Sequence, residues 1–123
     1  MEGKELNNLS FGLAKASDLP FSNDTQDLVV HSFLFDRLDD PAKALQEMYR
    51  VLKVGSQLIM FSPLNFDTAD LWEKLYPVFK IRELLESIGF TVTNWIEDIS
   101  IKEPLDFHGN YIQWKCLGIV ARK

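Results

Sequence analysis

The chain has 123 residues, of which 46% are apolar, and a formal net charge of -5 from 13 Lys and Arg against 18 Asp and Glu. A chain of this length is expected to form one globular domain that buries roughly two-thirds of its unfolded surface. The acidic balance, with no stretch that concentrates Lys or Arg, argues against nucleic acid as a partner. The apolar runs are short, and residues 1–5 carry charges where a signal peptide has its apolar core, so the sequence predicts a cytoplasmic protein without a membrane partner.

Two strands are predicted in the first third of the chain. Residues 8–16 form a short, mostly apolar run that predicts a strand, and the polar segment with Pro20 that follows is typical of a loop. Residues 27–35 include a continuous apolar run at positions 28–30, two of them valines. Such a run is typical of a strand that is buried on both faces of a sheet.

A helix and a third strand follow. Asp40 and Pro41 supply a helix cap and a first-turn proline, and the helix is expected to end near Gly55. Its apolar face, at steps of three and four residues, consists of Ala44, Leu45, Met48, Val51 and Leu52. On the outer face Glu47 and Arg50 predict a solvated ion pair. Residues 56–62 then read as a second buried strand.

The second half predicts two helices and two strands. Residues 71–75 favour a short helix, Pro77 a break, and Gly89 the left-handed end of a second helix. The apolar stripe of this second helix consists of Ile81, Leu84, Leu85 and Ile88. Residues 90–101 and 110–123 are rich in strand-forming residues and predict an antiparallel pair joined by a polar loop.

This order of elements predicts an α/β domain with a largely parallel sheet and helices on its faces. In such sheets ligands bind beyond the carboxyl ends of the strands. The candidate segments for a site are therefore residues 14–17, 31–35 and 62–65.

Several chemistries have no support in the sequence. Cys116 is the only cysteine and lies in an apolar run, which predicts a buried, inert thiol. His31 and His108 are the only histidines, and neither has neighbours at metal-ligand spacing, so no metal site is expected. A Gly-x-Ser-x-Gly hydrolase motif is absent.

Five short motifs occur together in one order along the chain. They are KASDLPF at 15–21, QDLV at 26–29, LDDP at 38–41, RVLKVGS at 50–56 and GF at 89–90. On these residues the chain resembles the second half of a class I S-adenosylmethionine-dependent methyltransferase, of the type that includes the ubiquinone and menaquinone biosynthesis enzymes. The resemblance implies a single domain over residues 1–123 with a Rossmann-like sheet, truncated at the N-terminus by two strands. It also implies that residues 1–7 are the tail of a helix.

The departures from the family pattern concern the cofactor. The Gly-rich turn and the acid that take the methionyl and ribose parts of S-adenosylmethionine in the family have no counterpart here. Lys15 stands where the family has an acid that accepts a hydrogen bond from the adenine amino group, and an ammonium group has no acceptor. Asp18, three residues on, is the candidate replacement.

The resemblance also implies site residues, each with a plain packing alternative. Four residues are candidates for cofactor binding: Lys15, Ala16, Asp18 and His31. His31 is in addition the one catalytic candidate, as a base with a near-neutral pKa. Four residues at the strand ends are candidates for substrate binding: Phe33, Phe35, Ser62 and Phe66.

Three functions fit these observations. The first is a methyltransferase for a small-molecule substrate, with its cofactor half supplied elsewhere. The second is a non-catalytic module that binds a protein partner, and the third is a small, self-contained enzyme that uses His31.

The family's strand order adds an expectation about association. The strand at residues 27–31 is left with a bare apolar edge, which is a site for pairing with another strand. We expect this edge to be covered either by residues 9–14, in a rearranged sheet, or by a second copy of the chain.

Overall fold

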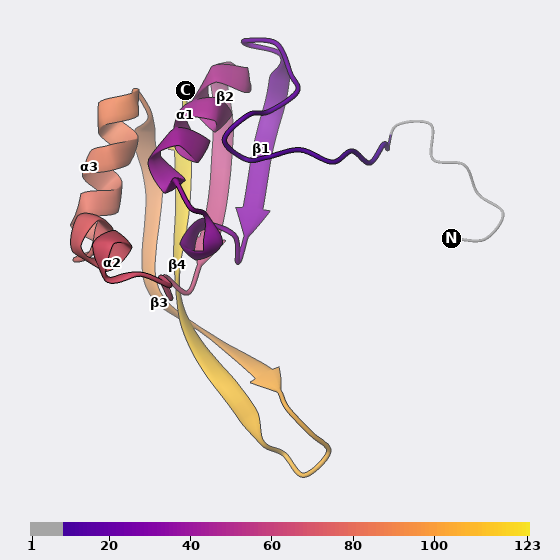
Figure 1. Cartoon of the computed structure of the whole chain (residues 1–123), viewed down its shortest axis with the longest axis vertical. Helices are drawn as coiled ribbons and strands as arrows, with labels where there is room; N and C mark the ends of the chain where they lie inside the picture. The colour runs from indigo at the N-terminus through magenta and orange to yellow at the C-terminus, as the bar shows by residue number, and fades with distance from the viewer. Residues whose placement is uncertain (1–8) are drawn as a thin grey trace, which may run out of the picture.

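The computed structural model describes residues 9–123 as one sheet with helices beside it (Figure 1). The elements are β1 (Gln26–Ser32), the 3-10 turn η1 (Phe35–Arg37), α1 (Pro41–Val51), β2 (Leu52–Ser62), α2 (Ala69–Leu75), α3 (Phe79–Ile88), β3 (Thr91–Pro104) and β4 (Tyr111–Arg122). The helix tail expected at residues 1–7 lies outside the described residues. Within 9–123, no helix is long and apolar enough to cross a membrane.

The four strands form a single sheet in the order β1-β2-β4-β3. β1 and β2 are parallel, whereas β4 is antiparallel to both of its neighbours. Three strands therefore share one direction, but only one of the three pairings is parallel, because β4 inserts between β2 and β3. The predicted α/β class and the final antiparallel pair are confirmed, and the expectation of a largely parallel sheet is corrected to a mixed one.

The helix boundaries follow local chemistry. The Asp40 side chain accepts a hydrogen bond from the Lys43 backbone N–H at 3.1 Å and caps α1, which begins with Pro41. α1 ends at Val51 rather than near Gly55, because the chain turns at once into β2. Gly55, with φ of +87°, lies inside that strand, where its backbone N–H donates to Lys123 O at 3.3 Å. The predicted stop of α3 at Gly89 is confirmed, with φ of +127°.

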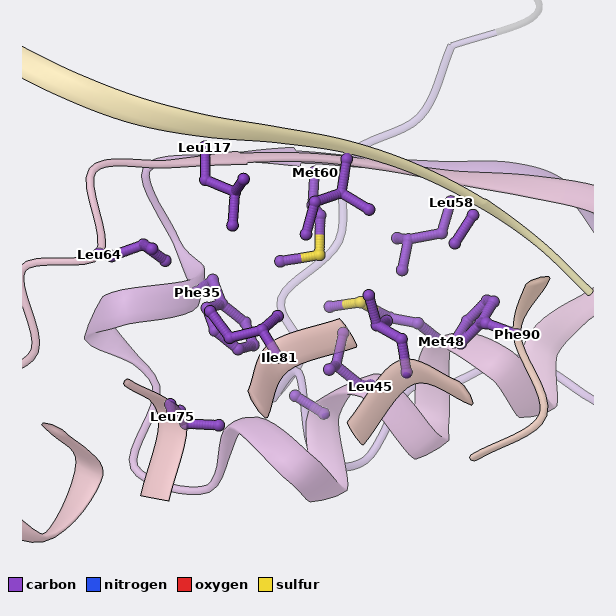
Figure 2. Packing of buried hydrophobic residues seen from close by; sticks show 14 of the residues in the cluster. Phe35, Leu45, Met48, Leu58, Met60, Leu64, Leu75, Ile81, Phe90 and Leu117 are labelled. Carbon is purple, nitrogen blue, oxygen red and sulfur yellow. The ribbon is translucent and has the colours of Figure 1, made fainter. Parts of the chain in front are cut away.

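The core lies between one face of the sheet and the three helices (Figure 2). The sheet contributes Leu58 and Met60 from β2, which alternate with less buried residues, and Leu117 from β4. α1 contributes Leu45 and Met48, and the predicted apolar stripe of this helix is confirmed. α2 and α3 add Leu75, Ile81 and Leu85.

The helices of residues 9–123 leave the opposite face of the sheet uncovered. In β1, Leu28 and Val30 are 50% and 60% exposed, whereas Val29 and His31 alternate with them and face the helices. Val30 pairs with Ile59 of the neighbouring strand β2. The expectation that β1 is buried on both faces is therefore wrong for the described residues, because their helices cover one face only. We call this surface the open face.

The strand expected at residues 8–16 does not form. Residue 8 lies outside the described range, and residues 9–14 have no strand partner. Leu9, Phe11 and Leu13 are 52%, 92% and 103% exposed. An extended segment is stable only when its backbone groups are paired. Because residues 9–14 do not pair with β1, this strand remains at the edge of the sheet. The expectation that residues 9–14 cover this edge is therefore wrong.

The end of the chain forms a long hairpin. β3 and β4 pair from Thr91 with Arg122 to Pro104 with Tyr111, with an irregularity between Ile96 and Ile99. The tip half of this ribbon extends beyond the sheet (Figure 1).

Candidate functional site

Two of the predicted cofactor residues meet in a tight turn. Asp18 N donates to Lys15 O at 3.0 Å, and the two residues form an isolated antiparallel bridge. Bridged residues lie directly opposite each other, so the Asp18 side chain emerges beside that of Lys15. The Asp18 carboxylate, which can accept a hydrogen bond, therefore lies next to Lys15.

Arg50 holds this loop against α1. Its guanidinium donates to Leu19 O at 3.0 Å, to Phe21 O at 2.8 Å and to Asn23 Oδ1 at 2.9 Å. It also pairs with Glu47 Oε2 at 2.7 Å. The predicted solvated pair is thus an anchor for the loop. Sequence reasoning missed this role because the spacing of Glu47 and Arg50 shows nothing of contacts about thirty residues away.

The turn borders a cavity of about 350 Å³. Lys15, Ala16 and Ser17 line one side, and residues 37–40 with Ala44 line the other. This places three consecutive residues of the loop against the segment that follows β1. Asp18 lines a second hollow of the same loop, again with Lys15.

His31 lies apart from these cavities. It is 8% exposed on the helix-covered face of β1, and neither ring nitrogen has a hydrogen-bond partner among the described residues. Burial lowers the pKa of His31 to about 4, so the imidazole is neutral at pH 7. The near-neutral pKa expected from the sequence is therefore wrong. A base with a pKa this low is poorly matched to proton abstraction at neutral pH.

The four substrate candidates do not form one pocket. Phe35 and Phe66 are core residues, 0% and 4% exposed, with ring centroids 6.0 Å apart. Ser62 is 1% exposed, and its Oγ accepts from Leu64 N at 3.1 Å. These three offer a ligand almost no surface. Phe33 has a positive φ of 54° and turns toward the open face, where its ring lies 5.8 Å from that of Phe61.

The loops after β1 and β2 are tied together at the carboxyl ends of these strands. Asn65 N donates to Asp36 Oδ2 at 2.9 Å. Asp36 is 4% exposed, and its Oδ1 has no partner in the described part of the chain. A buried carboxyl oxygen without a donor is costly and marks a position where a further donor would stabilise the protein. Sequence reasoning missed this buried carboxylate, because an Asp in a polar loop is expected to be exposed.

Cys116 behaves as predicted from its apolar surroundings. It is free and 1% exposed, and burial raises the pKa of its thiol. A protonated, buried thiol is a poor nucleophile.

Comparison with known families and proteins adds a sequence relationship to this geometry. A family described as a methyltransferase domain matches residues 2–60. The ubiquinone/menaquinone biosynthesis C-methyltransferase UbiE of Marinomonas sp. (strain MWYL1) is 34% identical over 87 residues, which are 71% of this chain and 34% of that relative. The chain therefore spans about a third of the length of the curated relatives that it matches.

Solved structures share the fold. A methyltransferase from Aquifex aeolicus, described as S-adenosylmethionine dependent, has a TM-score of 0.62 at 24% identity over 94% of this chain and 55% of its own. The [4+2]-cyclase SpnF has a TM-score of 0.66 at 16% identity over 92% of this chain and 56% of its own. The second comparison shows that this fold occurs in proteins named for other reactions.

We predict that His31 makes the protein less stable in acid. Above pH 6.5 the imidazole is neutral in the folded and unfolded chains. As the pH falls from 6.5 to about 4, the unfolded chain binds a proton that the folded chain does not. The free energy of unfolding should therefore fall by up to about 3 kcal/mol through this group.

Urea denaturation of the parent and of His31→Leu across this pH range measures the effect. The substitution should remove this part of the pH dependence, whereas His108→Gln, at an exposed position of the hairpin loop, should leave it unchanged. An equally steep loss of stability in His31→Leu would contradict the assignment of a buried, neutral imidazole.

Proposed function

Because the chain belongs to the class I S-adenosylmethionine-dependent methyltransferase family, we propose that it forms one side of a methyl-transfer site for a small molecule. A further polypeptide segment that pairs with β1 completes the cofactor site. The observation that carries this proposal is the position of β1 as an uncovered edge within residues 9–123, with the cavity of the cofactor candidates bordered by the segment that follows this strand. An exposed, apolar edge strand is a template for strand addition.

The residues of the loop fit part of the cofactor. The Asp18 carboxylate would accept from the adenine amino group, which Lys15 cannot do, and Ala16 would lie against the same ring. S-adenosylmethionine supplies an electrophilic methyl group when bound. In this proposal the chain binds and orients the reactants, which contributes through proximity more than through acid–base chemistry.

His31 has a supporting role in this proposal. Its ring is buried and neutral, so a self-contained reaction with His31 as the base is disfavoured. We assign it a packing role on the helix-covered face of the sheet, near the carboxyl end of β1.

A second candidate function is a non-catalytic module that binds a protein partner. Lys15 at the position of the family's acid favours it, as do the exposed Leu28 and Val30 on the open face. Both functions need the edge of β1 to be covered. They differ in whether the completed protein binds the cofactor.

A fusion protein separates the two functions. The region of the Marinomonas relative that precedes its matched segment is joined ahead of this chain, and S-adenosylmethionine is titrated calorimetrically into the fusion and into the chain alone. We expect the fusion to bind with a Kd tighter than roughly 100 μM, about 5.5 kcal/mol, and the chain alone to show no saturation at millimolar ligand.

The role of Asp18 is tested in the same fusion. Asp18→Asn should weaken binding about tenfold, since it replaces a charged acceptor. Glu86→Gln, at an exposed residue of α3 that pairs with Arg82, is the matched control and should have no effect. A folded fusion that binds no cofactor, even after Lys15→Asp, would favour the non-catalytic module.

We also propose that the chain alone self-associates through the edge of β1. Light scattering should give a mass above that of the monomer, and Val30→Lys should shift it to the monomer, because a charge on an edge strand opposes pairing. Val54→Lys, at a position that is already 81% exposed, should leave the mass unchanged. A parent chain that is monomeric at every concentration would rule this association out.

A further inference from the structure

An acidic cavity lies between the loops that leave β1 and β2. Its volume is about 320 Å³, which is within the range of small-molecule sites. Four aspartates line it: Asp36 and Asp39 from the segment after β1, Asp67 from the loop after β2, and Asp70 from the first turn of α2. Because β1 and β2 are parallel neighbours, these loops meet at the edge of the sheet where ligands bind in this class of fold.

Three of the four carboxylates have no ion-pair partner within residues 9–123. Asp70 pairs with Lys74 at 3.0 Å. Asp36 uses one oxygen for the loop hydrogen bond, and the other is buried without a partner. Asp39 and Asp67 make no side-chain hydrogen bond or ion pair within residues 9–123.

Helix capping does not account for these carboxylates. Asp40 caps α1, and Thr68 caps α2 by accepting from Leu71 N at 3.2 Å. Asp39 and Asp67 each lie one residue before a cap, take no part in capping, and line the cavity. Among the described residues, Arg37 is the one positive charge in the lining, against four carboxylates, so the cavity has an excess of negative charge that favours a bound cation.

We propose that this cavity binds the ammonium group of the methyl acceptor, which is a small organic amine with an apolar body. An ammonium group donates several hydrogen bonds and suits the unpartnered Asp36 oxygen as well as the Asp39 and Asp67 carboxylates. Leu38 and Leu71 also line the cavity and contact the apolar body. The identification of this amine as the methyl acceptor rests on the proposed function, whereas its binding does not.

A metal ion fits this cavity less well. Within the described residues, no three acidic, histidine or cysteine side chains are arranged as a metal-ligand set. Arg37 also lines the cavity, and its charge opposes a divalent cation more strongly than a single ammonium group.

The test is binding of phenethylamine to the full chain without cofactor, followed by amide chemical shifts in NMR. The uncharged 2-phenylethanol, of nearly the same shape, is the ligand control. We expect saturable shifts of amides in residues 36–39 and 67–71 with the amine alone. The double variant Asp39→Asn, Asp67→Asn should weaken the affinity by at least about tenfold.

A second double variant, Glu83→Gln with Glu97→Gln, removes two charges outside the cavity and should bind as the parent does. Equal binding of amine and alcohol, shifts confined to other residues, or no shifts at millimolar amine would overturn the proposal. These results are independent of cofactor binding, so amine binding without cofactor binding by the fusion would instead count against the proposed function.

Discussion

The structure depends on burial of the sheet from one side. The apolar stripes of α1 and α3 pack on the face that carries Leu58 and Met60, and α2 closes the same layer with Leu75 (Figure 2). Apolar burial contributes roughly 25 cal/mol per Å², so this single layer supplies most of the stabilisation. The open face and the outer edge of β1 gain much less of it in the described part of the chain, where Leu28 and Val30 stay at least half exposed. An uncovered edge beside an uncovered apolar face is therefore the main asymmetry of this fold.

The site reflects the same asymmetry. The loop at residues 15–21 is held by Arg50 against α1, and its turn faces the segment after β1. The loops after β1 and β2 are tied by the Asp36 side chain. These contacts fix the loops on one side of the proposed cofactor site, and the other side of that site is open in the described part of the chain. In our account the cofactor site is complete only when a further segment lies against β1, so cofactor affinity and association are linked.

The spacing of apolar residues along the sequence predicted most of the helices and strands. It failed where contacts between distant residues determine the structure. The stripes of both helices and the caps at Asp40 and Gly89 are local features, and they are where the sequence placed them. Residues 9–14 have strand-like composition but no partner, and composition does not report partners. For the site, the anchoring role of Arg50 and the burial of Phe35 depend on tertiary contacts. No spacing within the sequence encodes these contacts.

Hydrogen exchange at the β1 amides tests the central claim most directly. In the chain alone at high dilution, the amides of residues 26–32 that face away from β2 should exchange rapidly, and those of β2 should be protected. In the fusion with the segment of the Marinomonas relative, the same β1 amides should become protected as strongly as those of β2. Protection of β1 in a dilute monomer, or rapid exchange in a folded fusion that binds S-adenosylmethionine, would contradict the claim that an added strand completes this sheet.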